Sequence, residues 1–312
     1  MLRLLLLLLF SAPLLANSPT VVVSIKPYHS LVAAVMEGKG EPLLLVDGSF
    51  SPHTYSLKPR DASALQRAGL IIWGGESSEP FLEKALHSLA HNSKIIDLMQ
   101  LPSLHRLPIR GTQLWETEEK HEEEDHHDDH EEEEEEHYHP THGIDPHIWL
   151  TPENAMVITQ AAVTALSEID PAASQHYQEN GAKLIQQLQQ LDQQLAQRLY
   201  PLREYPFIVF HDSYQYMEAR YGLQTLGAVT RHVEHGSSVK AITAVREQIR
   251  QHKVRCLFKE PQFSSRMAQI AVEGSAAQIG VLDPLGANLI PGPKLYFQLM
   301  ENLSHSLRQC LQ

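Results

Sequence analysis

Short, uninterrupted apolar runs alternate with helix-like stretches along most of this chain, and this alternation constrains its fold most. Four runs lie in the first hundred residues: 20–25, 42–47, 70–75 and 94–98. Four more lie in the second half: 205–210, 223–229, 254–260 and 279–283. Such runs are typical of parallel strands that helices cover on both faces. The sequence therefore predicts an α/β fold with two parallel-sheet lobes, over residues 17–169 and 202–312.

A long helical pattern over residues 170–201 separates the two sets of strands. Asp170 is suited to an N-cap and Pro171 to the first helical position. The apolar residues behind them recur at steps of three and four: Tyr177, Leu184, Leu188, Leu191, Leu195 and Leu199. About 28 helical residues would span roughly 42 Å. We expect a rigid spine along both lobes of a monomer. The alternative, a coiled-coil dimer element, is less favoured because the pattern lasts only about three heptads.

The first residues, MLRLLLLLLFSAPLLANS, have the pattern of a secretory signal. We expect residues 1–16 to be a signal peptide that is cleaved after Ala16. The alternative is an uncleaved membrane anchor, but the apolar run is short for a membrane span. The mature protein is therefore expected to be exported and soluble.

An acidic, histidine-rich tract over residues 116–142 carries a net charge of −14, whereas the whole chain carries −13. The rest of the chain is thus nearly neutral, and this argues against a nucleic-acid partner. Six consecutive glutamates cannot be buried, so we expect a disordered surface loop. It contains seven of the 19 histidines: His121, His126, His127, His130, His137, His139 and His142. We expect the loop to capture or buffer metal ions with weaker sites, or else to be a solvated spacer.

Three other histidines occupy positions that favour a single metal site. His53 and His211 follow predicted strands in different lobes, and ligands of open parallel sheets bind beyond the carboxyl ends of strands. His147 precedes a predicted helix that Thr151 would cap. Three imidazoles with one open position suit Zn²⁺. Asp283, Glu260 or a water molecule could be the fourth ligand, although either acid could instead orient an imidazole.

The chain has two cysteines, Cys256 and Cys310. In an oxidising compartment they would plausibly form one disulfide, worth roughly 4 kcal/mol in the chain-entropy model. The alternative is two separate thiols.

Several motifs together resemble the ZnuA family, the zinc-binding components of ABC transporters. They are SPHTYSLKPRD, DPHIWLTPENA, FHDSYQYMEARYGL, KEPQFSS and LDPLGANL. The resemblance covers the chain in order, with the acidic loop, the long helix and the cysteine pair in their places. It implies a periplasmic receptor with two α/β lobes joined by a rigid helix and metal in the cleft between them.

The resemblance also implies roles for single residues. His53, His147 and His211 match the family's three histidine ligands. Manganese-type relatives carry Glu at the position of His211, so this chain resembles the zinc branch. Some zinc members carry a carboxylate directly before the first histidine, where this chain has Pro52. That departure favours Asp283 or water as the fourth ligand.

We therefore expect a protein that binds Zn²⁺, without enzymatic activity, and delivers it to an ABC-transporter permease. Neutral imidazoles would bind the ion more strongly as pH rises. A zinc hydrolase is the first alternative, but the sequence has no H-E-x-x-H motif and no nucleophile elbow. An adhesin or metal-storage module that uses the acidic loop is the second.

Overall fold

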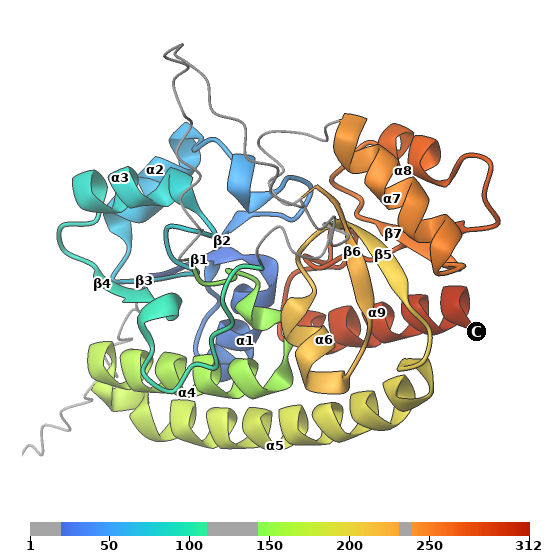
Figure 1. Ribbon diagram of the computed structural model, residues 1–312. Coiled ribbons are helices and arrows are strands. Elements are labelled where there is room, and N and C mark those ends of the chain that lie inside the picture. Colours follow the sequence, from blue (N-terminus) through green and yellow to red (C-terminus); the bar gives the residue numbers. More distant parts are fainter. Residues whose placement is uncertain (1–19, 111–142, 231–238) are drawn as a thin grey trace, which may run out of the picture.

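Two four-stranded parallel sheets form the two lobes, as the apolar runs predict (Figure 1). The structure, a computed structural model, describes residues 20–110, 143–230 and 239–312, and the side chains from residue 241 on in the last range. The N-terminal sheet has the order β2-β1-β3-β4. Its strands are β1 (Val21–Ile25), β2 (Leu43–Val46), β3 (Leu70–Trp73) and β4 (Lys94–Asp97). The helices between them are α1 (Lys26–Met36), α2 (Pro59–Arg67) and α3 (Pro80–Leu89).

The C-terminal sheet repeats this topology with the order β6-β5-β7-β8. Its strands are β5 (Phe207–His211), β6 (Thr225–Thr230), β7 (Cys256–Lys259) and β8 (Gln278–Val281). The connecting helices are α6 (Gln215–Tyr221), α7 (Val239–Gln251) and α8 (Ser265–Val272). In both sheets the strand order reverses beside the first strand of the lobe, and such switch points open a crevice at the carboxyl ends of the strands.

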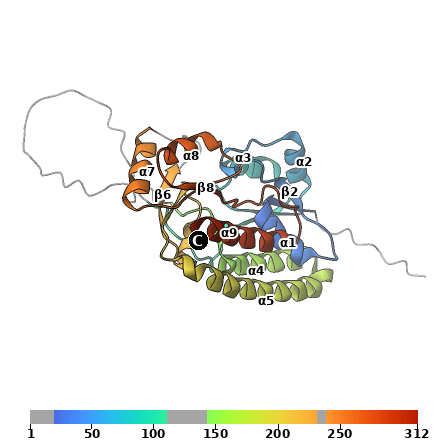
Figure 2. The same cartoon turned by 90° about the vertical axis from the view of Figure 1, so that its right-hand side faces the viewer.

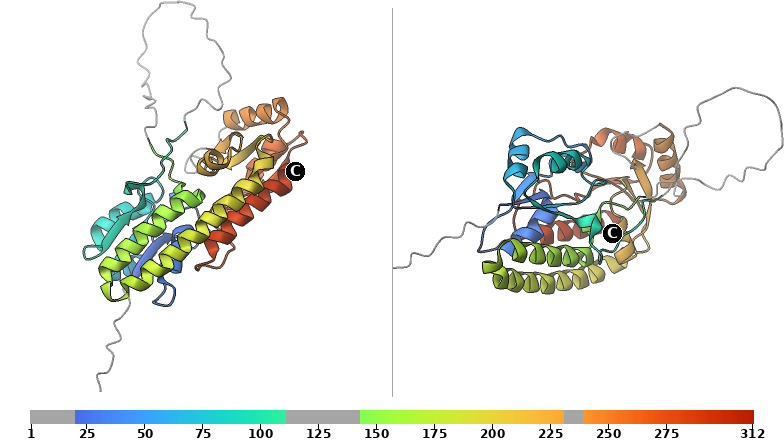
Figure 3. Two further views of the ribbon diagram at one scale, coloured as in Figure 1. Left: turned by 90° about the horizontal axis from the view of Figure 1, so that it is seen from below. Right: turned by 90° about the vertical axis from the view of Figure 1, so that its left-hand side faces the viewer.

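Three long helices form a layer beneath the lobes: α4 (Pro152–Ile169), α5 (Ser174–Leu199) and α9 (Leu295–Leu311) (Figures 1 and 3). Both α4 and α9 pack against α5. We call these three helices the helix layer. The α5 helix packs on α1 and α4 at one end and on α6 and α9 at the other, so it spans both lobes. The six apolar residues of the predicted spine are all buried in it.

The predicted start of this helix needs a correction. Asp170 is the C-cap of α4 and does not cap α5. Pro171 opens a single 3-10 turn, Pro171–Ala173, and α5 begins at Ser174. The Asp170 carboxylate instead accepts a hydrogen bond from the Tyr177 hydroxyl at 3.0 Å. It therefore contacts a side chain in the first turn of α5. Thr151, in contrast, caps α4 as expected, because its hydroxyl accepts from the Asn154 N–H.

One apolar core is continuous from the N-terminal sheet through the helix layer to one face of the C-terminal sheet. A second, smaller core fills the other face of that sheet, under α7 and α8. The α9 helix crosses from β8 to α1 and so joins both lobes (Figure 2). The expected disulfide is confirmed: Cys256 of β7 is bonded to Cys310 of α9, which fastens the C-terminal sheet to the helix layer.

Candidate metal centre

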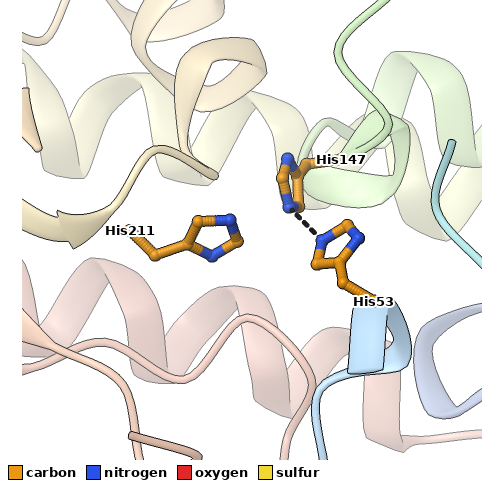
Figure 4. Close-up of side chains that lie close together, drawn as sticks. All are labelled: His53, His147 and His211. Atoms are coloured by element: carbon orange, nitrogen blue, oxygen red, sulfur yellow. Dashed lines mark hydrogen bonds between the residues drawn. The ribbon is translucent and has the colours of Figure 1, made fainter. Parts of the chain in front are cut away.

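Three imidazoles from distant parts of the chain meet between the two lobes (Figure 4). His53, His147 and His211 each offer a ring nitrogen, and these nitrogens lie within 4.8 Å of one another. The Nε2 atoms of His53 and His147 are 3.3 Å apart. His147 and His211 are only 4% and 5% exposed, and His53 is half-buried. The arrangement can surround a single small cation.

Local backbone structure places each ring. His53 lies in a 3-10 turn, Pro52–Thr54, beyond β2, and the Ser51 hydroxyl accepts from its backbone N–H. His147 directly precedes the 3-10 turn Ile148–Leu150 that leads into α4. His211 is the last residue of β5 itself, rather than the residue after it. Two rings therefore come from the N-terminal lobe and one from the C-terminal lobe, so an ion between them touches both.

A buried carboxylate orients His147. The Asp145 Oδ1 atom lies 2.7 Å from the His147 Nδ1 and also accepts from the His147 backbone N–H at 2.9 Å. A proton on Nδ1 can be donated to this carboxylate, which leaves Nε2 with a free lone pair toward the cluster. Burial lowers the pKa of His147 to about 3, so its imidazole is neutral and ready to bind a cation.

A second buried carboxylate lies beside His211. The Glu260 Oε1 atom is 3.3 Å from the His211 Nδ1, and it accepts from the Ser213 hydroxyl at 3.0 Å. Burial is the largest single influence and lowers the pKa of His211. The charge and hydrogen bond of Glu260, together with the charges of Asp212 and Asp145, outweigh it, so the net shift of this pKa is upward. Glu260 stabilises the protonated form of the His211 ring, so a metal ion that binds this ring would displace a proton.

The cavity at the cluster is very small, about 10 Å³. Besides the three histidines its walls include Trp149, Glu260, Gln262, Pro284 and Leu285. A volume of roughly 10–15 Å³ is what one water-sized sphere requires. The site thus has room for a single ion or water molecule and none for an organic substrate.

The loop after β8 forms one wall of this cavity and is tied to the opposite lobe. Lys26, at the start of α1, donates from Nζ to the carbonyl oxygens of Gly286, Ala287 and Leu289, at 2.8–2.9 Å. The Trp149 indole N–H donates to the Pro284 carbonyl at 2.8 Å. These contacts hold the wall of the cavity across the lobe boundary.

Asp283 does not join the three imidazoles. Its two oxygens accept from the backbone N–H groups of Leu285, Gly286 and Ala287, at 2.6–3.2 Å. The carboxylate therefore shapes the loop from within, and among the described residues the metal-type cluster contains only the three histidines. Sequence position alone suggested Asp283 because it follows a strand, but backbone amides compete for its oxygens.

Sequence reasoning did not predict the contacts that three residues of this region make: Asp145, Lys26 and Gln262. The D-P-H spacing of Asp145 and His147 was a usable signal, because an aspartate two residues before a histidine can bond to both its backbone and its ring. Lys26 and Gln262 act on residues far away in sequence, and no local pattern marks such contacts.

Other sequence expectations fall outside the described residues. They include the signal peptide 1–16 and the acidic loop 116–142 with its seven histidines. The ends of the segment that holds the acidic loop are described: Pro108 and Ile144 form an antiparallel bridge. In the described part of the chain, every helix is too short or too polar to span a bilayer.

Two α/β lobes of the same topology, a helix layer that spans both, and three convergent imidazoles between them define a metal-site receptor of the solute-binding class. The chain belongs to the ZnuA family: residues 21–310 match the family model described as zinc-uptake complex component A, periplasmic.

Curated relatives and solved structures agree with this assignment. The high-affinity zinc uptake system protein ZnuA of Brucella abortus (strain 2308) is 41% identical in an alignment 304 residues long. The alignment covers 93% of this chain and 91% of that protein. Its counterpart in Yersinia pestis is 34% identical over 98% of this chain and 96% of its own. A crystal structure of ZnuA has a TM-score of 0.76 at 22% identity and covers 95% of this chain and 100% of its own. At that identity the structure supports the fold alone.

Proposed function

We propose that this protein is a periplasmic receptor that captures Zn²⁺ between its lobes and delivers it to the permease of an ABC transporter, as a monomer and without a nucleic-acid partner. The observation that carries the proposal is the cluster of His53, His147 and His211. Membership of the ZnuA family supports the class of cargo and the transporter partner. The disulfide suits the oxidising periplasm.

The donor set favours zinc over harder cations. Three neutral nitrogen donors are borderline soft and suit Zn²⁺, whereas carboxylate and carbonyl oxygens suit Mg²⁺, Ca²⁺ and Mn²⁺. His53, His147 and His211 would be the protein ligands. Asp283 stays a candidate for the fourth position, but its three backbone hydrogen bonds compete with ligation. Glu260 is held by Ser213 and Tyr214 and is better suited to orient His211.

The size of the cavity favours binding over hydrolysis. A zinc hydrolase needs an open position on the metal and space for a substrate beside it. A cavity of about 10 Å³ lined by Pro284 and Leu285 offers no such space in this conformation. Delivery requires only that the two lobes separate enough to loosen the third imidazole.

Metal analysis of the mature protein under native conditions tests the assignment. We expect one tightly held zinc per chain in native mass spectrometry, removable by a chelator. Single replacement of His53, His147 or His211 by Ala should weaken binding by at least about a hundredfold, because each removes one of three nitrogen ligands. His87→Ala, at an exposed position of α3, is the matched control. Unchanged binding in all three site variants would refute the proposed site.

We also propose that the acidic loop 116–142 gathers cations next to the site. Its two flanks meet where Asp145 N–H donates to the Leu107 carbonyl and Ile109 N–H donates to the Gly143 carbonyl. The loop therefore ends five residues before His147, and the flank between them includes Asp145, which bonds to that ligand. Scattered histidines in a strongly negative segment raise the local cation concentration without a fixed geometry.

Deletion of residues 116–142 tests this role and leaves both flanks in place. We expect the full chain to bind additional, weaker zinc ions and the deleted chain to bind one. Growth in scarce zinc should slow with the deleted chain. A stoichiometry of one for both chains, with equal uptake, would refute the accessory role.

The organisation of the chain is part of the same proposal. Cleavage after Ala16 would leave a mature chain with an N-terminal lobe to residue 169, a linking helix over 170–201 and a C-terminal lobe from 202. The intact mass of the exported protein tests the cleavage. A mass that includes residues 1–16 would indicate an uncleaved anchor.

A further inference from the structure

One polar atom in the wall of the metal cavity has no partner. Gln262 follows β7 by three residues and lines the cavity with the three histidines. Its Oε1 atom is buried and makes no hydrogen bond with any described residue. A buried acceptor without a donor costs about 1–3 kcal/mol, so such an atom in a native site indicates a missing water or ion.

The orientation of this carboxamide is fixed by its surroundings. The Gln262 nitrogen donates to the Gly48 carbonyl at 2.8 Å and lies 3.5 Å from the Asp283 Oδ1. Both neighbours are acceptors, so exchanging the nitrogen and oxygen of the amide would set oxygen against oxygen. The nitrogen therefore faces Gly48, and the oxygen is the atom left over in the cavity wall.

Other oxygens near the site are already engaged. Glu260 Oε1 accepts from the Ser213 hydroxyl and lies within 3.4 Å of the Tyr214 hydroxyl. The Asp283 carboxylate holds three backbone amides of its own loop. Pro52, before the first histidine, has no side-chain donor or acceptor. Among the described residues of this wall, the Gln262 Oε1 is a buried side-chain oxygen that lacks a hydrogen-bond partner.

We propose that the Gln262 carboxamide oxygen serves the fourth coordination position of the bound ion, either as a direct ligand or as the acceptor for a single metal-bound water. This inference rests on the proposed function and assigns a residue to its open position. Three imidazole nitrogens and one oxygen give the tetrahedral set that Zn²⁺ prefers.

The Gln262 amide would then contact the bound ion, or its water, through its oxygen and the other lobe through its nitrogen. Its nitrogen bonds to Gly48, in the loop that leads to His53, while its own backbone belongs to the C-terminal lobe. A movement of the 48–53 loop that frees His53 would also pull the Gln262 amide out of position. Two ligand positions would thus be loosened by one displacement.

Two substitutions of nearly equal size separate this role from a purely structural one. Gln262→Glu and Gln262→Met both lose the N–H group that bonds to Gly48, but only Glu keeps an oxygen. Zinc affinity is measured by competition with a chelator. We expect the Met variant to bind Zn²⁺ at least about tenfold more weakly than the Glu variant. A ratio below tenfold would overturn the inference, because Met offers neither the ion nor a bound water an oxygen. Repulsion of the Glu carboxylate by the Gly48 carbonyl and Asp283 works against the expected ratio and does not produce it.

A spectroscopic readout completes the test. Co²⁺ in place of Zn²⁺ gives visible absorption bands that depend on the ligand set. We expect these bands to change in Gln262→Met relative to the parent protein; identical bands would overturn the inference. X-ray absorption on the zinc-loaded Met variant separates the two sources: loss of the oxygen neighbour indicates direct ligation, and its retention indicates a water.

Failure of this inference can be told apart from failure of the proposed function. If His211→Ala abolishes stoichiometric zinc binding while the Glu and Met variants bind equally, only the role of Gln262 is wrong. If His211→Ala still binds one zinc as tightly as the parent, the three-histidine site itself is wrong. Thermal unfolding of each metal-free variant confirms that the comparison is made between folded proteins.

Discussion

The two lobes are joined twice, and the two junctions differ in kind. In the helix layer, α5 presents Tyr177 and five leucines to a continuous apolar core. Near the metal cavity, the contacts across the lobes are polar. They include Lys26, Trp149 and Gln262, each bonded to a backbone carbonyl of the other lobe. We call these three contacts the interlobe seam.

The two junctions differ in the free energy that is needed to open them. Each buried leucine of the layer contributes roughly 1.5–3 kcal/mol, and the contributions act together along the whole helix. A hydrogen bond contributes about 1 kcal/mol net, somewhat more where one partner is charged. Thermal motion can therefore open the seam while the layer keeps both lobes in place. We expect a small pivot at the helix layer rather than a wide hinge.

The largest effect should come from a cavity in the helix layer. Leu188, in the middle of α5, is completely buried. Leu188→Ala should lower the free energy of unfolding by about 3–5 kcal/mol, because the packed helices cannot collapse into the space. Denaturant titration measures it, with exposed Gln186→Ala as the control. A loss below about 1 kcal/mol would mean that the layer is not the firmer junction.

The next effect concerns a polar group inside the N-terminal core. Glu79 is fully buried and accepts from the Gly74 N–H at 3.0 Å. Burial raises the pKa of Glu79 from its ordinary value of 4.5 to about 8, with a further contribution from Asp97. The folded protein therefore keeps a proton that the unfolded chain releases above pH 4.5, and the free energy of unfolding should fall as pH rises from about 4.5 to 8.

The substitution Glu79→Gln should remove this fall, which amounts to a few kcal/mol at most, on the order of 1.4 kcal/mol per pH unit. This variant is compared with Glu83→Gln, at an exposed position of α3, in urea titrations between pH 4.5 and 8. If both variants keep the slope of the parent protein, another group carries the proton.

A smaller effect is expected from the seam. Lys26→Met keeps the length of the side chain but removes the donor to three carbonyl oxygens. Stability should fall by about 2 kcal/mol, and zinc should dissociate several-fold faster, because the loop that walls the cavity loses its anchor. Stopped-flow release to a chelator and hydrogen exchange of the 285–287 amides measure both, with Lys183→Met as the control. Equal release rates would show that the seam does not gate the ion.

The smallest effect should follow from Asp145→Asn. Asparagine can still accept from the His147 ring and backbone, but it lacks the charge that supports the ring as a donor to metal. Zinc affinity should fall about tenfold while the stability of the metal-free protein changes little. Exposed Glu204→Gln serves as the control. Unaltered affinity would leave Asp145 with a purely structural role.

Features that a local sequence pattern marks could be predicted from the sequence, and features without such a pattern could not. Eight apolar runs became eight parallel strands among the described residues, because burial on both faces demands continuous apolar sequence. The three histidines stood out because they follow strands or precede a capped helix. The 3-10 turn after Asp170 was missed, because a proline suits the start of either helix type.

Contacts between residues far apart in the chain left no pattern to find. Lys26 reaches carbonyls about 260 positions later, and any residue can supply a carbonyl. For the same reason sequence could not decide between Asp283, Glu260 and water at the fourth position. Three backbone amides bond to the Asp283 carboxylate and so compete with a metal ion for its oxygens. These bonds form only when the loop is folded, so the sequence does not show them.

The path of α9 has a consequence for the order of assembly. This 17-residue helix packs on α1. Tyr296, near its start, donates from its backbone N–H to the Ser30 hydroxyl and from its own hydroxyl to the Trp149 carbonyl. The lobe that is synthesised first is therefore finished by a segment that is synthesised after the C-terminal sheet. Until that segment arrives, the early lobe exposes apolar surface to holdases and proteases, so a chain truncated before Leu295 should be degraded rather than accumulate as a half-protein.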